Sequence, residues 1–238
     1  MKKIILCLFC ALLVCSLKAQ SLIGAWESYS VAENGDSLRS VVIFADGFQV
    51  ITTYEAQTGR FISTNGGSWQ LEGDQMTEVV EFDTQKPERV GSEVRFQIRI
   101  SKDEIQIVGS DSKFRRIDNG QPGKLQGAWL MSGRVRDGKT SMRDTNRPRK
   151  TMKILSGTRF QWIAYNTETR EFKGTGGGTY STIDGKYTEN IEFFSRDDNK
   201  AGLILAFNFE LIEGTWHHTG LSSKGDPIHE IWSPRQKQ

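Results

Sequence analysis

Cysteine, proline and net charge are all scarce in this 238-residue chain, which has three cysteines, five prolines and a formal net charge of +2 at pH 7. So small a charge predicts neither a nucleic-acid partner nor binding to an anionic membrane, because such domains are clearly basic. Charged residues still make up 25% of the chain and hydrophobic residues 37%, which is typical of a globular protein with a core. The 24 glycines indicate many tight turns.

The first 19 residues have the pattern of a secretory signal peptide. Two lysines precede an apolar run over residues 4–14, and Ala19 is a small residue of the kind at which signal peptidase cleaves. The run is shorter than the ~20 residues of a transmembrane helix, and no later segment is apolar enough to span a bilayer. We therefore expect export to the periplasm or the extracellular space. A lipoprotein signal acylated at Cys15 is less favoured, because Val14 stands where a small residue is expected.

All three cysteines, Cys7, Cys10 and Cys15, lie inside this predicted signal. The mature chain would then contain none, which excludes disulfide bonds, thiolate nucleophiles and cysteine-ligated zinc. Three lysines leave with the signal as well, so 28 basic side chains face 29 acidic ones. We expect the hydrophobic core alone to hold the fold together.

An internal repeat organises the rest of the chain. Residues 22–26 recur as 125–129, and after an insertion of eight residues in the second copy the likeness continues at an offset of 111. The pairs at this offset are Tyr54 with Tyr165, 66–69 with 177–180, 76–82 with 187–193, and 96–109 with 207–220. We expect one domain over residues 20–118, a linker over 119–124 and a second domain over 125–238.

Each copy is expected to consist of short antiparallel strands. Residues 94–100 alternate polar side chains with Phe96, Ile98 and Ile100, which is the period of a half-buried strand. Glycine and aspartate punctuate the chain at short intervals, as hairpins require, and no amphipathic helix follows the signal. About eight strands per copy favour a closed barrel, because closure removes exposed sheet edges. A flattened β-sandwich is the alternative.

The strand pattern and several motifs resemble lipocalin and calycin barrels. A Gly-x-Trp opens each copy, at Gly24 and Gly127. The second copy is similar to a family of bacterial secreted lipocalin-like domains of unknown function, over about residues 125 to 235. The motifs that carry this likeness are Gly176-Gly177-Gly178-Thr179-Tyr180, Tyr187-x-Glu189-x-Ile191-Glu192-Phe193, Trp216-x-His218-x-Gly220 and Glu230-x-Trp232. The resemblance implies two tandem lipocalin-like barrels and no particular reaction.

In the strand expected over residues 76–82, Met76, Glu78, Val80 and Phe82 share a mostly apolar face. We therefore expect Glu78, and its counterpart Glu189 in the second copy, to point into the barrel among hydrophobic neighbours. Burial of a carboxylate is costly unless a partner stabilises its charge. These two glutamates are thus candidates for a polar network or a ligand anchor.

The inward face of the second barrel carries the main candidate site. Trp216 and His218 occupy positions that are apolar in the first copy and should point inward. A turn centred near Lys224 would pair Trp216 with Trp232 and His218 with Glu230. The predicted ligand-binding residues are Glu189, His218, Glu230, Trp216, Trp232, Tyr180 and Trp162.

Two interpretations of these residues stay open. In the first, the carboxylates and the histidine anchor a ligand in an aromatic-lined pocket, the usual composition of a small-molecule site. In the second, they form a satisfied network inside a barrel that its own side chains fill, as eight-stranded barrels allow. The first copy has Ile107 where the second has His218, so the second barrel is the better candidate for a ligand.

Other motifs carry weaker signals. His217, His218 and His229 are close in sequence, but His217 and His218 are adjacent on a strand and point to opposite faces, so no metal site is expected. The glycine-rich residues 174–178 lead into a strand and not into a helix. A turn or a bulge is therefore expected there and not a phosphate-binding loop.

Charge is divided unevenly between the copies. Residues 20–118 hold 10 basic and 16 acidic side chains, whereas 119–238 hold 18 and 13. Between Arg134 and Lys153, eight basic residues face only Asp137 and Asp144. This segment is either an anion-attracting rim of the second barrel or a solvated loop. The opposite charges of the two halves favour packing of one barrel on the other.

These observations predict an exported, non-enzymatic binding protein whose second barrel holds a small or oligomeric ligand. The alternative is an extracytoplasmic protein- or glycan-interaction module with filled barrels and no internal ligand. An enzyme that uses Glu189, Glu230 or His218 for acid-base chemistry ranks last, because no nucleophile, cofactor motif or metal set accompanies them. We predict no catalytic residue, metal or cofactor, and a small molecule or glycan as the partner.

Overall fold

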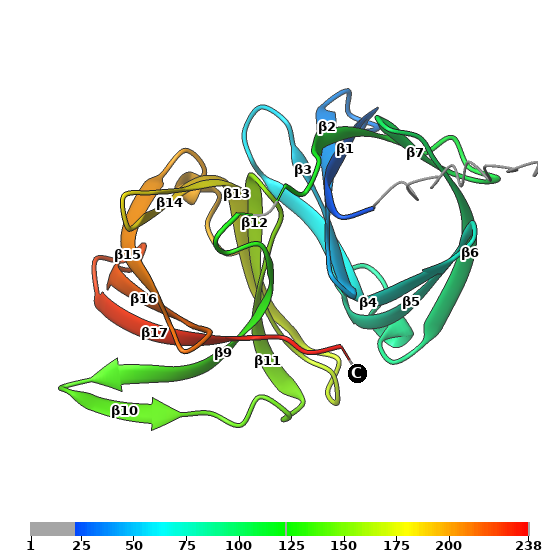
Figure 1. Cartoon of the computed structure of the whole chain (residues 1–238). Helices are drawn as coiled ribbons and strands as arrows, with labels where there is room; N and C mark the ends of the chain where they lie inside the picture. The colour runs from blue at the N-terminus through cyan, green and yellow to red at the C-terminus, as the bar shows by residue number, and fades with distance from the viewer. Residues whose placement is uncertain (1–21, 122, 238) are drawn as a thin grey trace, which may run out of the picture.

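A computed structural model of the chain describes residues 22–121 and 123–237. Within these ranges, strands β1 to β17 form two antiparallel barrels that stand side by side (Figure 1). The two tandem all-β barrels predicted from the sequence are thereby confirmed. The predicted signal peptide lies outside the described residues. No helix within the described ranges has the length and apolar character needed to cross a membrane.

The first barrel is a closed ring of eight strands in chain order, in which β1 pairs with both β2 and β8. A 3₁₀ turn, η1 (Pro87–Arg89), follows β5. The strands are β1 (Gly24–Val31), β2 (Ser37–Ala45), β3 (Phe48–Glu55), β4 (Phe61–Glu72), β5 (Gln75–Asp83), β6 (Glu93–Ile100), β7 (Glu104–Ile107) and β8 (Lys113–Asp118).

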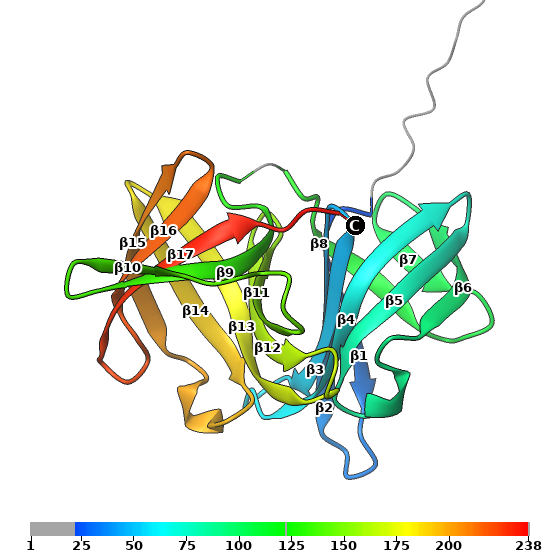
Figure 2. The same ribbon diagram turned by 90° about the horizontal axis from the view of Figure 1, so that it is seen from below.

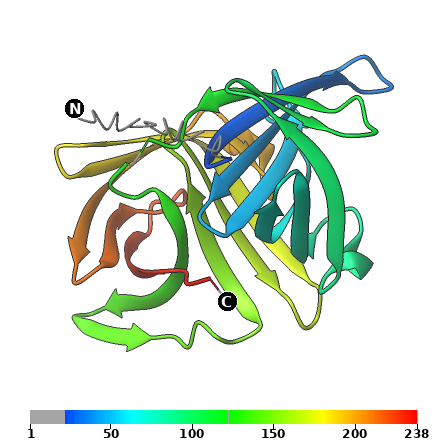
Figure 3. The same cartoon turned by 45° about the vertical axis from the view of Figure 1, so that its right-hand side comes forward.

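The second barrel repeats this order and is closed by pairing of β17 with β9. The segment in which the sequence predicts an insertion contains β10, which pairs with β9 as a hairpin beside the ring (Figure 3). A second 3₁₀ turn, η2 (Asp198–Lys200), follows β14. The strands are β9 (Gly127–Arg136), β10 (Lys139–Met142), β11 (Arg149–Leu155), β12 (Arg159–Asn166), β13 (Phe172–Ile183), β14 (Lys186–Phe194), β15 (Ile204–Ile212), β16 (Thr215–Leu221) and β17 (Pro227–Pro234).

A bulge at the same place in both copies reverses the direction of the side chains that follow it. In the first copy Gly67 lies opposite Val80 and Gly66 opposite Phe82, so Glu81 is the extra residue. A Cβ on Gly67 would collide with a backbone carbonyl of β5, so only glycine fits at this close approach. The expectation that Phe82 points inward is therefore wrong, because the bulge turns its ring out of the barrel.

The second copy has the equivalent bulge between Gly177 and Gly178, with Glu192 as the extra residue. The glycine-rich residues 174–178 thus lie within a bulged strand, which fits the expectation from their sequence. Phe193, the counterpart of Phe82, also turns out of its barrel. Both phenylalanines belong to a hydrophobic cluster that the two barrels share.

This shared cluster forms the interface between the barrels, where β11 and β12 meet β2, β3 and β5 (Figure 2). The repeat makes the contacts reciprocal. Tyr54 of the first barrel stacks on Phe193 of the second, with ring centroids 4.9 Å apart. Tyr165 of the second barrel packs on Phe82 of the first at 4.8 Å. Tyr54 and Tyr165, which match in the repeat, therefore have the same role on opposite sides.

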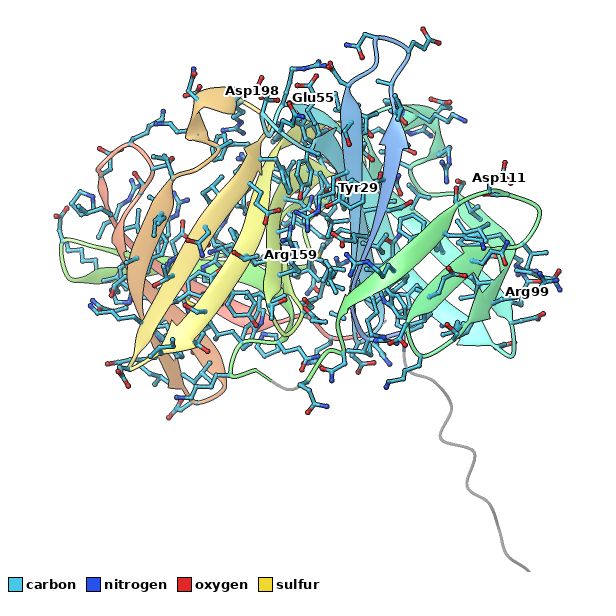
Figure 4. All side chains as sticks on the ribbon, turned by 90° about the horizontal axis from the view of Figure 1, so that it is seen from above. Tyr29, Glu55, Arg99, Asp111, Arg159 and Asp198 are labelled. Atoms are coloured by element: carbon cyan, nitrogen blue, oxygen red, sulfur yellow. The ribbon has the colours of Figure 1, made fainter. Side chains whose placement is uncertain are left out.

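Each interface tyrosine donates a hydrogen bond to a glutamate of the other barrel. Tyr54 Oη donates to Glu192 Oε2 at 2.6 Å, and Tyr165 Oη donates to Glu81. Glu192 also accepts hydrogen bonds from Arg159, which lies between the barrels in Figure 4, and from Arg39 at 3.0 Å. Burial raises the pKa of Glu192, but the bonds from Arg159 outweigh it and leave that pKa below its ordinary value.

Opposite charges contribute to the packing of the barrels, as the charge division suggests, but the ion pairs run in both directions. Arg235 of the second barrel pairs with Glu81 of the first, whereas Arg39 of the first pairs with Glu192 of the second. The two barrels also share the hydrophobic cluster and buried hydrogen bonds of Gln161 with Thr52 and Thr64. The hydrophobic cluster and the repeat symmetry, more than the difference in net charge, account for the interface.

Candidate functional site

The predicted site residues of the second barrel lie at its interior or along its rim. Trp216, Trp232 and Tyr180 are buried, and Glu189 and His218 are 4% and 2% exposed. Glu230 and Trp162 are partly exposed. The predicted pairings of Trp216 with Trp232 and of His218 with Glu230 are confirmed by the register of β16 and β17.

These aromatic side chains pack against one another inside the barrel. The rings of Trp216 and His218 stack with centroids 5.3 Å apart, and Phe207 meets His218 edge-on at 4.1 Å. Tyr187 contacts Trp216 at 5.0 Å. Together with Leu125, Trp129 and other apolar residues they form one buried cluster. The space between the strands is thus largely occupied by side chains of this chain.

Lys153 lies at the centre of this interior, although its place in a basic segment of the sequence suggested a surface position. Its Nζ is 2.8 Å from Oε1 of Glu189, and the two side chains are 6% and 5% exposed. Four aromatic rings surround the ammonium group with centroids 4.9 to 6.0 Å away, those of Tyr187, Trp216, Trp232 and Phe207. Ring faces attract cations, so Lys153 is held by both a carboxylate and a cage of π-systems.

Several polar atoms in this interior have no hydrogen-bond partner among the described residues. They are Tyr187 Oη, Trp216 Nε1, Trp232 Nε1 and both ring nitrogens of His218. His218 Nδ1 is 3.8 Å from Glu230 Oε2, which is too long for a hydrogen bond. Burial, and next the charge of Lys153, lower the pKa of His218 well below its usual range, so the ring is neutral. Ligand binding by these residues stays a prediction.

The first barrel contains a cavity of about 210 Å³ that is open to solvent on one side. Most of its wall is apolar, and the polar lining residues are Gln49, Asn65, Glu78 and Arg89. The apolar lining consists of Val42, Phe44, Ile51, Met76, Phe96, Ile98, Ile105, Ile107 and Phe114. These side chains come from strands β2 to β8, so the cavity lies inside the ring of strands.

Glu78 points into this cavity as expected, and no hydrogen bond to its side chain exists among the described residues. Burial raises its pKa to about 7, and the nearby positive charge of Arg89 only partly opposes this. Arg89 is itself engaged, with Nη1 3.3 Å from Oδ2 of Asp83. Glu78 is therefore a half-buried carboxyl group without a hydrogen-bond partner among the described residues.

The remaining motifs lie on the outer surface. His217 Nδ1 and His229 Nε2 are 3.1 Å apart, whereas His218 points into the barrel, as the alternation of strand side chains predicts. No group of three or more metal-ligating side chains occurs in the described part of the chain. The basic segment lines a surface groove of about 350 Å³ with Arg143, Arg147, Arg149 and Lys150. The ammonium of Lys150 donates to the carbonyls of Thr145 and Arg147 there.

Comparisons with known proteins give a distant structural likeness. No family model matches the chain, and no curated protein matches its sequence. Among solved structures, the chain is similar to a lipocalin-like protein from Bacteroides uniformis, with 16% sequence identity and a TM-score of 0.34. The match covers 48% of this chain and 100% of that one. Two eight-stranded antiparallel barrels follow one another along the chain, which is the architecture that the sequence resemblance implied.

Proposed function

We propose that the protein is a non-enzymatic binding protein that holds a small, largely apolar molecule inside its first barrel. The cavity of about 210 Å³ carries this proposal, because apolar walls with a few polar groups are typical of small-molecule sites. An apolar cavity of about 150 Å³ accommodates benzene, so this one suits a ligand of about eight non-hydrogen atoms. Export by the predicted signal of residues 1–19 would make it an extracytoplasmic carrier.

The chemistry of the lining supports binding without catalysis. Among the described residues that line the cavity there is no serine, threonine, cysteine, histidine or lysine. Glu78 therefore has no nucleophile beside it to activate. The second barrel would support the first through the shared interface, with Lys153 and the aromatic rings filling its interior.

A second candidate is the site predicted from the sequence in the second barrel. The unpartnered atoms of Tyr187, Trp216, Trp232 and His218 favour it, because buried polar groups normally have hydrogen-bond partners. A polar group bound among them would supply those partners. Ile107 of the first barrel and His218 of the second are repeat counterparts. The two candidate sites make opposite predictions for variants of these two residues.

Calorimetric titration with hexanol, whose size matches the cavity, tests the proposal. We expect saturable binding that Ile107→Trp abolishes, because the larger ring fills the first barrel, and that His218→Ala leaves unchanged. Binding that survives Ile107→Trp and is lost in His218→Ala would assign the ligand to the second barrel. Absence of saturable binding of hexanol and of toluene to the unaltered protein would overturn the proposal.

A further inference from the structure

We propose that the ligand of the first barrel is an organic ammonium ion, in which a short apolar chain fills the cavity and the charged end pairs with Glu78. The inference rests on the proposed function and specifies its ligand class. The second barrel supports this inference, because there the ammonium group of Lys153 pairs with Glu189, the repeat counterpart of Glu78.

The strand registers fix which residues correspond. Lys153 on β11 lies opposite Trp129 on β9, and Val42 on β2 lies opposite Trp26 on β1. Val42 therefore stands where the second barrel has Lys153. Glu78 pairs across β4 and β5 with Trp69, just as Glu189 pairs across β13 and β14 with Tyr180. The two glutamates thus occupy equivalent positions. Glu189 faces a lysine, whereas Glu78 has a valine at the corresponding position.

The aromatic cage around Lys153 also has a counterpart. The registers of the last strands match Tyr187, Phe207, Trp216 and Trp232 with Met76, Phe96, Ile105 and Phe114. All four counterparts line the cavity, as do Val42 and Glu78. The cavity therefore corresponds in position to the aromatic cage of the second barrel. It has no lysine, and the side chains are smaller at three of the four cage positions. Phe96 and Phe114 keep two ring faces for a cation.

Glu78 lacks the charged partner that stabilises Glu189 in the second barrel. Glu189 is stabilised by an ammonium group 2.8 Å away, whereas Glu78 has no such partner and its pKa is raised to about 7 by burial. A ligand ammonium would give Glu78 an ion pair like the one between Lys153 and Glu189 in the second barrel. The apolar part of the ligand would occupy the volume opened by Val42, Met76 and Ile105, where apolar burial adds to the affinity.

Arg89 is the charged group that would favour a different ligand. It lines the cavity and attracts the carboxylate of Glu78, and it could instead hold a carboxylate ligand beside a protonated Glu78. Its guanidinium group is paired with Asp83, however, and its side chain is 34% exposed. The position that matches Lys153 Nζ lies beside Glu78 and among the counterparts of the aromatic cage, which include Phe96 and Phe114, so we assign the polar end of the ligand to Glu78.

Calorimetric titrations with hexylamine, hexanol and hexanoate at pH 8 separate these ligand classes on the full chain. We expect hexylamine to bind at least tenfold more tightly than hexanol, because a hydrogen bond between an ammonium and a carboxylate is stronger than one from a neutral hydroxyl. The isosteric change Glu78→Gln should remove this preference while hexanol binding persists. Arg89→Gln should strengthen hexylamine binding, because it removes a competing positive charge.

Equal binding of hexylamine and hexanol, or tightest binding of hexanoate with loss of that binding in Arg89→Gln, would overturn the inference and leave the proposed function intact. Failure of all three compounds to bind would overturn both. Val42→Lys provides an independent test, since it supplies the ammonium group from within. It should abolish hexylamine binding, and retained binding in a folded Val42→Lys protein would contradict the inference.

Discussion

Replacing Lys153 with methionine is the most informative perturbation of the filled barrel. Methionine keeps the length and apolar character of the lysine stem but removes the ammonium group 2.8 Å from Glu189. The side chain of Glu189 is 5% exposed, so its charge would remain buried among aromatic rings without a partner. Removing one member of a buried pair costs about 3 to 5 kcal/mol. We expect Lys153→Met to lower the free energy of unfolding by that amount.

The matched control is Lys139→Met, the same chemical change on the exposed strand β10. An exposed site should change stability by about 0.5 kcal/mol or less. The double variant Lys153→Met, Glu189→Leu replaces the whole ion pair with apolar side chains, which is often neutral or stabilising. It should therefore recover much of the stability that the single variant loses.

Urea unfolding at pH 7, followed by tryptophan fluorescence, measures all three variants. Two results would contradict this expectation: a cost for Lys153→Met no greater than that for Lys139→Met, or a double variant no more stable than Lys153→Met. Either would mean that water or another group compensates the charge of Glu189.

Three further predictions concern His218, Glu78 and the interface. The pKa of His218 should rise in Lys153→Met, because the repulsion from Lys153 disappears; an unchanged NMR titration would contradict this. The carboxyl of Glu78 has an ordinary pKa of 4.5 and a pKa of about 7 in the folded protein. Its contribution to the free energy of unfolding is therefore full below pH 4.5 and is lost as the pH rises through 7, by about 1.4 kcal/mol per pH unit. Glu78→Gln should therefore gain stability over the unaltered protein between pH 5 and pH 8 in urea titrations, and parallel curves would count against the burial of Glu78. Tyr54→Phe and Tyr165→Phe should each lower the free energy of unfolding by about 1.5 to 3 kcal/mol, because each removes a hydrogen bond to a glutamate of the other barrel. The control is Tyr29→Phe, because among the described residues the exposed hydroxyl of Tyr29 makes only a long 3.5 Å contact with Glu27 of its own barrel. Clearly unequal costs for the two interface tyrosines would contradict the reciprocal geometry.

The repeat was sufficient to predict two barrels and much of their register. A turn centred near Lys224 predicted the pairing of Trp216 with Trp232. Strand alternation and the offset of 111 residues predicted that Glu78 and Glu189 point inward. Alternation failed at Phe82, because the bulge opposite Gly67 depends on the neighbouring strand and not on the residues of β5 themselves.

Which barrel is hollow could not be read from residue types alone. Aromatic residues on an inward face are compatible with both a lined pocket and a filled core, and the outcome depends on summed side-chain volumes. The burial of Lys153 could not be predicted from its neighbours, because it belongs to a run of basic residues, and such residues are ordinarily solvated. Its alignment with Val42 in the repeat was the signal that could have revealed it, since Val42 belongs to an apolar strand face.

A crystal structure of the protein grown with hexylamine at pH 8 would show directly whether the first barrel holds the ligand. We expect density for the ligand between Val42 and Glu78, with the nitrogen within hydrogen-bond distance of the Glu78 carboxylate. Lys153 should remain paired with Glu189 in the second barrel. An empty first barrel, with density for the ligand beside His218 and Glu230, would contradict the account.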